Sequence, residues 1–274
     1  MDANTLFGSL DLVAGSGYTL NSEERAALQT SLRILKKDHK FNRVLFWGKI
    51  LGLDADYFIA QGRGEDEMKN RTSFYSLNCT DWFQLPLATD SVITMVTKAA
   101  KGRFMGDPSF VYKHDDPQKQ GAEDEEETAD IVTEEMRLAV TVHAIDKDVS
   151  VVPRGAFVKR HHGLVQLNRS FGGLSESEAK KLDSYLHFSE PKNLKKKSIL
   201  ELAELNPAID FLDVVSDDVP KGSWSLQVEC AGTVCVLRSL LWLGLTNYCV
   251  PMTQQHGYIY IGDGIKNLNL PFMI

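Results

Sequence analysis

The sequence predicts an α+β fold with a largely antiparallel sheet, grouped helices and one acidic surface loop. Short β-rich runs joined by tight turns occur near the start and in the final third, while helical periodicities gather between them. The 274 residues are 43% hydrophobic and 24% charged, which is typical of a folded globular protein with a sizeable core. No internal repeat of fixed period is present.

A capping box predicts the first long helix. Asn21 is a good N-cap residue, and Glu24 stands three positions later, where its side chain can reach back to the cap. The apolar residues that follow repeat at helical spacing and form one stripe: Leu28, Leu32 and Leu35. We therefore expect a helix that packs on one side.

Three β-rich runs come next. Residues 43–51 and 55–60 are joined by a tight connection at 52–54, so they predict a hairpin, and residues 72–77 predict a third strand. A helical pattern from about residue 90 to 101 predicts a helix that stops at Gly102.

The acidity of the chain is concentrated in one segment. Between Asp115 and Glu135 there are ten acidic residues and one base, a net charge of −9, whereas the whole chain has a net charge of −7. Residues 113–130 have no periodicity, and we expect them to form a mobile insertion. Five consecutive acids are candidates for electrostatic contact with a basic partner: Glu123, Asp124, Glu125, Glu126 and Glu127. A solvated loop without a partner is the alternative.

The second half begins with a helical pattern and continues with short elements. Apolar residues from Ile131 to Val149 predict a helix that leads out of the acidic segment and is broken at 153–155. Residues 156–159 and 164–167 predict short strands on either side of a tip that exposes the histidine pair His161-His162.

Two further capping boxes, at Ser175 and Ser198, predict helices. The first of these helices would place Leu182, Tyr185 and Leu186 together. Alternating residues in the final third predict strands at 224–230, at 234–236 and at 258–261.

The residue types that catalysis requires do not form a recognisable motif. The four cysteines lack a CxxC pair, and neither Gly62-Arg-Gly64 nor Gly262-Asp-Gly264 matches a phosphate-binding loop. Cys230, Cys235 and Cys249 lie in apolar β-like sequence, where buried and inert thiols are usual. We expect no enzyme activity, no metal and no cofactor. A hydrolase that pairs one of the cysteines with His256 is the competing hypothesis.

Charge and hydropathy argue against nucleic-acid and membrane partners. The basic cluster Lys192, Lys195, Lys196 and Lys197 follows a loop pattern and predicts a solvated turn rather than a nucleic-acid surface. The longest apolar stretch, residues 234–250, is interrupted by polar residues, and the first residues do not have the pattern of a secretory signal. These features predict a cytoplasmic protein.

A series of segments, in order over nearly the whole chain, resembles the radial spoke head protein 9 family of motile cilia and flagella. The segments are 46–62 (FWGKILGLDADYFIAQG), 75–82, 101–112, 153–157, 168–188, 220–227, 234–248 and 257–272 (GYIYIGDGIKNLNLPF). The larger radial spoke head proteins 4 and 6 share some of these motifs, and the present length favours protein 9. Leu243 departs from the family pattern, because proline is expected there.

The resemblance implies a single domain over residues 1–274 and a non-enzymatic structural subunit of the radial spoke head, located in the axonemal cytoskeleton of a cilium or flagellum. It implies as partners the radial spoke head protein 4/6 paralogues, radial spoke head protein 1 and spoke stalk protein 3. The central pair apparatus would be its functional contact, to which the acidic loop could turn. A regulatory binding module, whose acidic loop recruits a basic partner, is the alternative.

A subunit of a stable assembly is expected to carry aromatic anchors at its interfaces. Most of the aromatic residues must lie in the core of a chain of this size. We select Tyr57, Trp242 and Tyr258 as candidate interface anchors, and we expect the run 258–261 to offer an unpaired strand edge to a neighbour.

Overall fold

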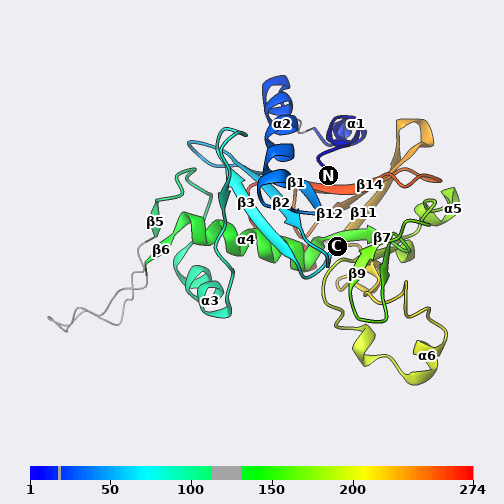
Figure 1. Ribbon diagram of the computed structural model, residues 1–274. Helices are drawn as coiled ribbons and strands as arrows, with labels where there is room; N and C mark the ends of the chain where they lie inside the picture. Colours follow the sequence, from blue (N-terminus) through cyan, green and yellow to red (C-terminus); the bar gives the residue numbers. More distant parts are fainter. Residues whose placement is uncertain (18–19, 113–130, 274) are drawn as a thin grey trace, which may run out of the picture.

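A computed structural model describes residues 1–17, 20–112 and 131–273. An eight-stranded sheet passes through the centre of the molecule (Figure 1). Its order is β11-β12-β13-β14-β1-β2-β3-β4, so two four-stranded meanders from distant parts of the chain lie side by side. Their strands are β1 (Arg43–Ile50), β2 (Tyr57–Arg63), β3 (Arg71–Ser76) and β4 (Phe83–Gln84), then β11 (Trp224–Glu229), β12 (Val234–Ser239), β13 (Leu245–Cys249) and β14 (His256–Gly262).

The two meanders meet in one parallel pair, β1 with β14, where Gly48 lies opposite Tyr260 and Ile50 opposite Gly262. All other pairs within the sheet are antiparallel, which confirms the predicted fold class. The prediction of an unpaired edge at 258–261 is wrong, because β14 is paired on both sides, with β13 and with β1. The partner on the parallel side is about two hundred residues away in the sequence, and local patterns do not reveal such a pairing.

Because of a β-bulge at Trp47, β1 contributes large side chains to the core on both faces of the sheet. Phe46 lies opposite Ala60 and Gly48 opposite Ile59, so Trp47 is the extra residue. An extra residue reverses the alternation of side chains along a strand. Phe46 accordingly packs in the core on one face, whereas Trp47 and the later Ile50 pack in the core on the other.

Helices cover both faces of the sheet (Figure 1). On one face lie α1 (Leu6–Leu12) and α2 (Ser22–Asp38), and on the other lies α4 (Glu134–Val149). The smaller elements are α3 (Asp90–Ala99), β5 (Val111–Tyr112), β6 (Val132–Thr133), β7 (Val151–Pro153), β8 (Phe157–Lys159), β9 (Val165–Leu167), α5 (Glu176–Ala179), β10 (Tyr185–His187) and α6 (Ile199–Ala203), together with six short 3-10 turns.

Local signals predicted most of these elements correctly. The capping box at Asn21 and Glu24 is formed, with hydrogen bonds of 2.7 and 2.8 Å, and the hairpin of β1 and β2 and the third strand are present. The helix after the acidic segment is confirmed as α4, although it begins at Glu134 and leaves Ile131 exposed. The histidine pair at 161–162 lies on the exposed turn between β8 and β9.

The segment after Ser175 differs from its prediction. Its capping box is formed, but α5 is only four residues long, and Tyr185 and Leu186 lie in β10 instead of a helix. β10 pairs with β7, which contains Pro153, so sheet pairing overrides the helical spacing here. Strand β13 had no prediction, because its residues 245–249 mix apolar and polar side chains and are buried on both faces.

We expect Gly48→Ala to lower the free energy of unfolding by about 3 kcal/mol or more. Gly48 has a φ of +150°, and a Cβ atom there would lie 1.9 Å from the carbonyl oxygen of Tyr260, on the parallel partner strand. The matched control is Gly8→Ala in α1, where a Cβ would meet nothing within 4 Å. It should leave stability unchanged or raise it by up to about 1 kcal/mol. Urea unfolding followed by circular dichroism measures the free energy of unfolding of both variants. If the two substitutions change it equally, the close approach of β1 and β14 at Gly48 does not matter for stability.

Candidate functional site

The three aromatic residues selected as interface anchors lie inside the chain. Tyr57, Trp242 and Tyr258 are 0%, 5% and 7% exposed. Each of the three side chains donates a hydrogen bond to an acidic residue of α4. The hydroxyl of Tyr57 donates to Glu134 at 2.7 Å, the indole N–H of Trp242 to Asp148 at 3.0 Å, and the hydroxyl of Tyr258 to Asp146 at 3.3 Å. In this conformation they fasten α4 to the sheet and do not present a surface to a partner.

Glu134 is the most heavily bonded of these acids. It is fully buried, and its carboxylate accepts hydrogen bonds from four donors: Tyr57 Oη (2.7 Å), the amides of Met105 (2.8 Å) and Gly106 (2.7 Å), and Tyr112 Oη (2.6 Å). Arg137 donates to the hydroxyl of Tyr112 at 2.6 Å, and its guanidinium lies 4.1 Å from the centroid of the Phe104 ring. These four hydrogen bonds replace those that water would make, so the carboxylate is stable although it is buried.

This network lies at the stem of the acidic segment. β5 and β6 pair with each other, with Val111 opposite Thr133 and Tyr112 opposite Val132. Burial, followed by the hydrogen bond to Glu134, raises the pKa of Tyr112 to about 12, so its hydroxyl stays a donor at neutral pH. The chain thus enters and leaves the segment through a fixed pair of strands. The predicted contact residues Glu123, Asp124, Glu125, Glu126 and Glu127 lie outside the described residues.

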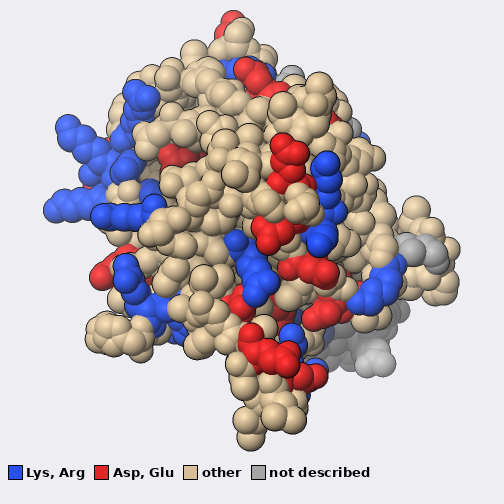
Figure 2. Space-filling view, turned by 90° about the vertical axis from the view of Figure 1, so that its right-hand side faces the viewer, with Lys and Arg blue, Asp and Glu red and all other residues tan. Residues whose placement is uncertain are grey.

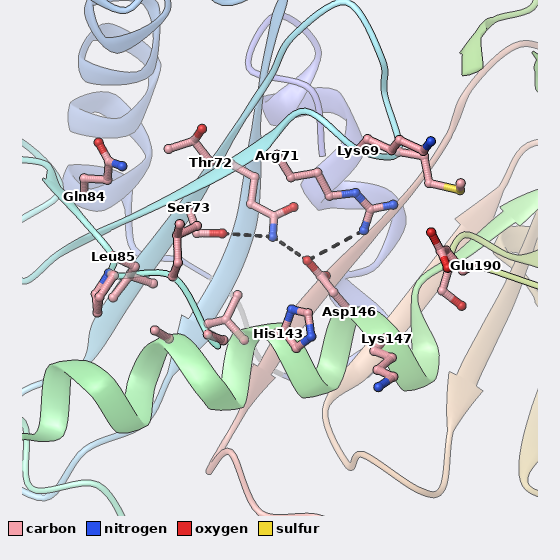
Figure 3. Close-up of a pocket in the computed structure, with 18 of the residues that line it drawn as sticks. Lys69, Arg71, Thr72, Ser73, Gln84, Leu85, His143, Asp146, Lys147 and Glu190 are labelled. Carbon is pink, nitrogen blue, oxygen red and sulfur yellow. Dashed lines mark hydrogen bonds and ion pairs between the residues drawn. The ribbon is translucent and has the colours of Figure 1, made fainter. Parts of the chain in front are cut away.

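A cavity of about 710 Å³ lies between the β3–β4 edge of the sheet, helix α4 and the segment 189–195 (Figure 3). Five basic side chains line it, namely Lys69, Arg71, Lys147, Lys192 and Lys195, against two acidic ones, Asp146 and Glu190. The sequence predicted a solvated turn at Lys192 and Lys195 and gave no function to the rest of the lining. The available signal was Asp146, a charged residue inside the apolar stripe of α4, next to Val142 and Ile145.

Asp146 forms the floor of this cavity and joins both meanders. It accepts hydrogen bonds from Trp47 Nε1 of β1 (2.7 Å), from Gln61 Nε2 of β2 and from Tyr258 Oη of β14. In Figure 3 its carboxylate points from α4 toward Arg71, and the two groups are 4.0 Å apart. The charge of Asp146 is therefore shared among several donors of the protein itself.

Arg71 and Arg63 bring positive charge beneath the cavity. Arg63 is 1% exposed and donates to the Gln61 side chain and the Glu67 carbonyl, and Arg71 donates to the carbonyl of Phe188 at 2.8 Å. The Nε atoms of both arginines are buried and have no hydrogen-bond partner among the described residues. Burial, followed by repulsion from Arg63, lowers the pKa of Arg71 to about 10, so the guanidinium stays charged at neutral pH.

The lysine-bearing wall of the cavity is held by Asp213. The amides of Lys192, Asn193 and Leu194 donate to its carboxylate at 2.6, 2.9 and 2.7 Å. Burial opposes the charged form, but these backbone hydrogen bonds outweigh it, so the pKa of Asp213 is lowered. The segment is thus an ordered turn, anchored by one carboxylate.

The buried thiols of Cys79 and Cys249 do not have the environment of a catalytic nucleophile. Burial raises the pKa of Cys79 and of Cys249 to about 12, and burial lowers the pKa of His256 to about 4. Cys249 and His256 lie opposite each other on β13 and β14, but the Nδ1 atom of His256 faces the carbonyl of Gln254. These directions oppose the formation of a thiolate–imidazolium pair. Cys230 was predicted to be buried and is exposed, because it follows the end of β11 in a turn.

The surface carries both signs of charge and some apolar side chains. Figure 2 shows basic side chains gathered at the left of one face, with acidic and basic side chains mixed toward its centre and lower part. Helix α6, at the bottom of Figure 1, exposes Ile199 and Leu200 by 86% and 81%. Within residues 1–17, 20–112 and 131–273, no helix has the length and apolarity required to cross a membrane. The same residues contain no group of three or more His, Cys, Asp or Glu placed to hold a metal ion.

The core thus fills both faces of the sheet, and a cavity lined by charged residues lies at the β3–β4 edge. Comparison with known proteins shows the family. Residues 2–160 match the model of the family described as "Radial spokehead-like protein". The chain therefore belongs to the radial spokehead-like protein family. It is 63% identical to a radial spoke head protein 9 homolog of Danio rerio, 51% to one of Homo sapiens and 51% to one of Xenopus tropicalis, each covering the full length of both chains.

We expect Glu134→Gln to destabilise the protein by about 2–4 kcal/mol. The amide group of glutamine places N–H donors where tyrosine hydroxyls and backbone amides already donate, so some donors of the network lose their acceptor. The exposed Glu65→Gln is the control and should have an effect within about 0.5 kcal/mol. Thermal and urea unfolding give the stabilities, and hydrogen exchange at the amides of Met105 and Gly106 reports the stem. A variant that keeps full protection at these amides would show that the carboxylate does not hold the stem.

We expect the turn at 192–194 to loosen in acid. A lowered carboxyl pKa contributes stability that is present above the unfolded value, near 4, and lost as the pH falls through the lower folded value. Hydrogen exchange of the amides of Lys192, Asn193 and Leu194, corrected for intrinsic rates, should thus be constant from pH 7 to about pH 4 and faster below it. Asp213→Asn should speed exchange at neutral pH, and the exposed Asp217→Asn should not. Acceleration that begins above pH 5 would contradict the assignment to Asp213.

Proposed function

We propose that the protein is a non-enzymatic structural subunit of the axonemal radial spoke head in cilia and flagella. It would support the assembly of the head and the transmission of signals from the central pair to the dyneins that drive motility. The observation that carries the proposal is the identity of 63% with a radial spoke head protein 9 homolog over the full length of both chains. Relatives from fish, frog and human share that name and length.

The physical properties of the chain support a structural role. The thiols with raised pKa values are suited to a stable core in a reducing compartment and not to covalent catalysis. The sheet draws its strands from both ends of the sequence, which favours one domain over residues 1–274. The exposed apolar side chains Ile199 and Leu200 and the stem at β5 and β6 offer contacts outside the core.

The proposed partners follow from the family. They are the radial spoke head protein 4/6 paralogues, radial spoke head protein 1 and spoke stalk protein 3, with the central pair apparatus as the functional contact. Contacts in a permanent assembly are dominated by buried apolar and aromatic groups and survive high salt. Attraction between charged surfaces is screened beyond the Debye length, about 8–10 Å near physiological salt, and this length shortens as salt rises.

A regulatory binding module is the second candidate. The observation that favours it is the net charge of −9 between residues 115 and 135, in a chain whose other residues are nearly neutral. Such a segment would recruit a basic partner by long-range attraction. The contact residues would be Glu123, Asp124, Glu125, Glu126 and Glu127, presented on the stem that Glu134 and Tyr112 hold in place.

The test is affinity capture of the tagged full chain from motile ciliated cells at about 0.15 M salt and again at about 0.5 M salt. We expect radial spoke head proteins to be recovered at both concentrations. A variant in which residues 123–127 carry Gln and Asn in place of Glu and Asp keeps the length and removes the charge. It should retain these partners if the protein is a scaffold. Loss of the partners from this variant would move the recruitment hypothesis to first place, and recovery of no spoke protein by the unmodified chain would refute the scaffold.

A further inference from the structure

The cavity at the β3–β4 edge has the size and composition of a binding site. Its volume of about 710 Å³ lies within the range of ligand pockets, about 300–1,000 Å³. It is lined by β3, by the connection after β4, by α4 and by the segment 189–195. The wall that carries Lys192 is ordered by Asp213, so much of the site is formed before a ligand arrives.

Two buried arginines beneath the cavity have N–H groups that the described residues leave without an acceptor. Asp146 is the acid closest to Arg71, yet its carboxylate already accepts from Trp47, Gln61 and Tyr258. Arg63 lies beside Arg71 and adds a second buried cation. Both Nε–H groups point to no acceptor among the residues that the structure describes. Arg71 itself lines the cavity, so an anion bound there would lie beside a largely buried cation.

The rim of the cavity extends this positive charge. Lys69 and Lys147 are exposed and lie on different segments, the turn before β3 and the end of α4. Lys192 and Lys195 stand on the 189–195 wall, and Glu190 is the one acid among the exposed side chains of the lining. Cations spread over three segments suit a ligand with several separated carboxylates more than one compact anion.

The lining also includes apolar residues. Leu85, Pro86 and Leu87 form one side, and Ala139 and Val142 of α4 form the other. Leu87 is 80% exposed, which is unusual for a leucine beside a cavity and leaves apolar surface for a ligand to cover. A ligand that fits both the rim and these walls carries acidic groups together with an apolar side chain.

We propose that this cavity is a docking site for an acidic peptide segment of a partner protein, with an aliphatic or aromatic side chain between its carboxylates. The apolar side chain packs on the exposed Pro86 and Leu87. The carboxylates face Lys69, Arg71 and Lys147, which Figure 3 labels in the cavity lining. The inference rests on the cavity alone and holds whichever assembly contains the protein.

Fluorescence anisotropy with the full chain tests the proposal. The probe is a short fluorescein-labelled peptide of alternating glutamate and leucine, and we expect saturable binding that weakens as salt rises. Lys69→Glu and Lys147→Glu should each weaken binding about tenfold, and Leu87→Asp should do the same by removing the apolar contact. All three side chains are exposed, so the variants should keep the unfolding temperature of the unmodified chain. Arg71→Met is omitted because Arg71 also holds Phe188.

Lys181→Glu is the matched control, since it makes the same change of charge on an exposed side chain outside the cavity lining. It should change the affinity by less than about twofold. An equal loss in Lys181→Glu and Lys147→Glu would reduce the effect to net charge and overturn the proposal. Absence of saturable binding would overturn it as well. If a glutamate peptide without leucine binds equally well and inorganic phosphate displaces it, the site binds small anions, and the peptide assignment fails.

Discussion

The structure depends on the parallel contact between β1 and β14. Each meander alone would be a four-stranded sheet with an open edge, and the contact turns the two into one sheet with a continuous core on each face. The close approach of the two strands requires Gly48, because the carbonyl of Tyr260 occupies the position of a side chain. The bulge at Trp47 then aims an indole into the core on the α4 side, where its Nε1 donates to Asp146.

Acidic residues at both ends of α4 form hydrogen bonds to the two meanders from one face of the sheet. Glu134 at the start binds Tyr57 of the first meander, while Asp146 near the end binds both meanders and Asp148 binds Trp242 beyond β12. Polar groups inside a core give geometric specificity that apolar packing alone lacks, provided that their partners are complete. Glu134 meets that condition within the chain. Near Asp146 the condition is not met, because the buried Nε atoms of Arg63 and Arg71 have no hydrogen-bond partner among the described residues.

Sequence reasoning succeeded where structure is decided locally. Capping boxes at Asn21, Ser175 and Ser198 are all formed, because each depends on residues three positions apart. The pairing of β14 with β1, and of β10 with β7, depends on residues far apart in the sequence. For this reason residues 258–261 were wrongly predicted to form an unpaired edge strand. The aromatics Tyr57, Trp242 and Tyr258 were singled out as contacts with a partner, and their contacts are with α4. Charged residues within the apolar periodicity of that helix, Glu134 and Asp146, were the signal that went unused.

The order of the strands also constrains how the protein is made. β1 emerges early in synthesis, but its parallel neighbour β14 contains residues 256–262 and is among the last elements to be added. During synthesis residues 1–3 are already present to pair with residues 44–46 of β1, but residues 48–50 on the same edge have no partner until β14 is made. Contacts between residues so distant along the chain form slowly. Through most of the synthesis of the chain, the β1–β4 meander thus carries a short open stretch of edge to which another strand can pair wrongly.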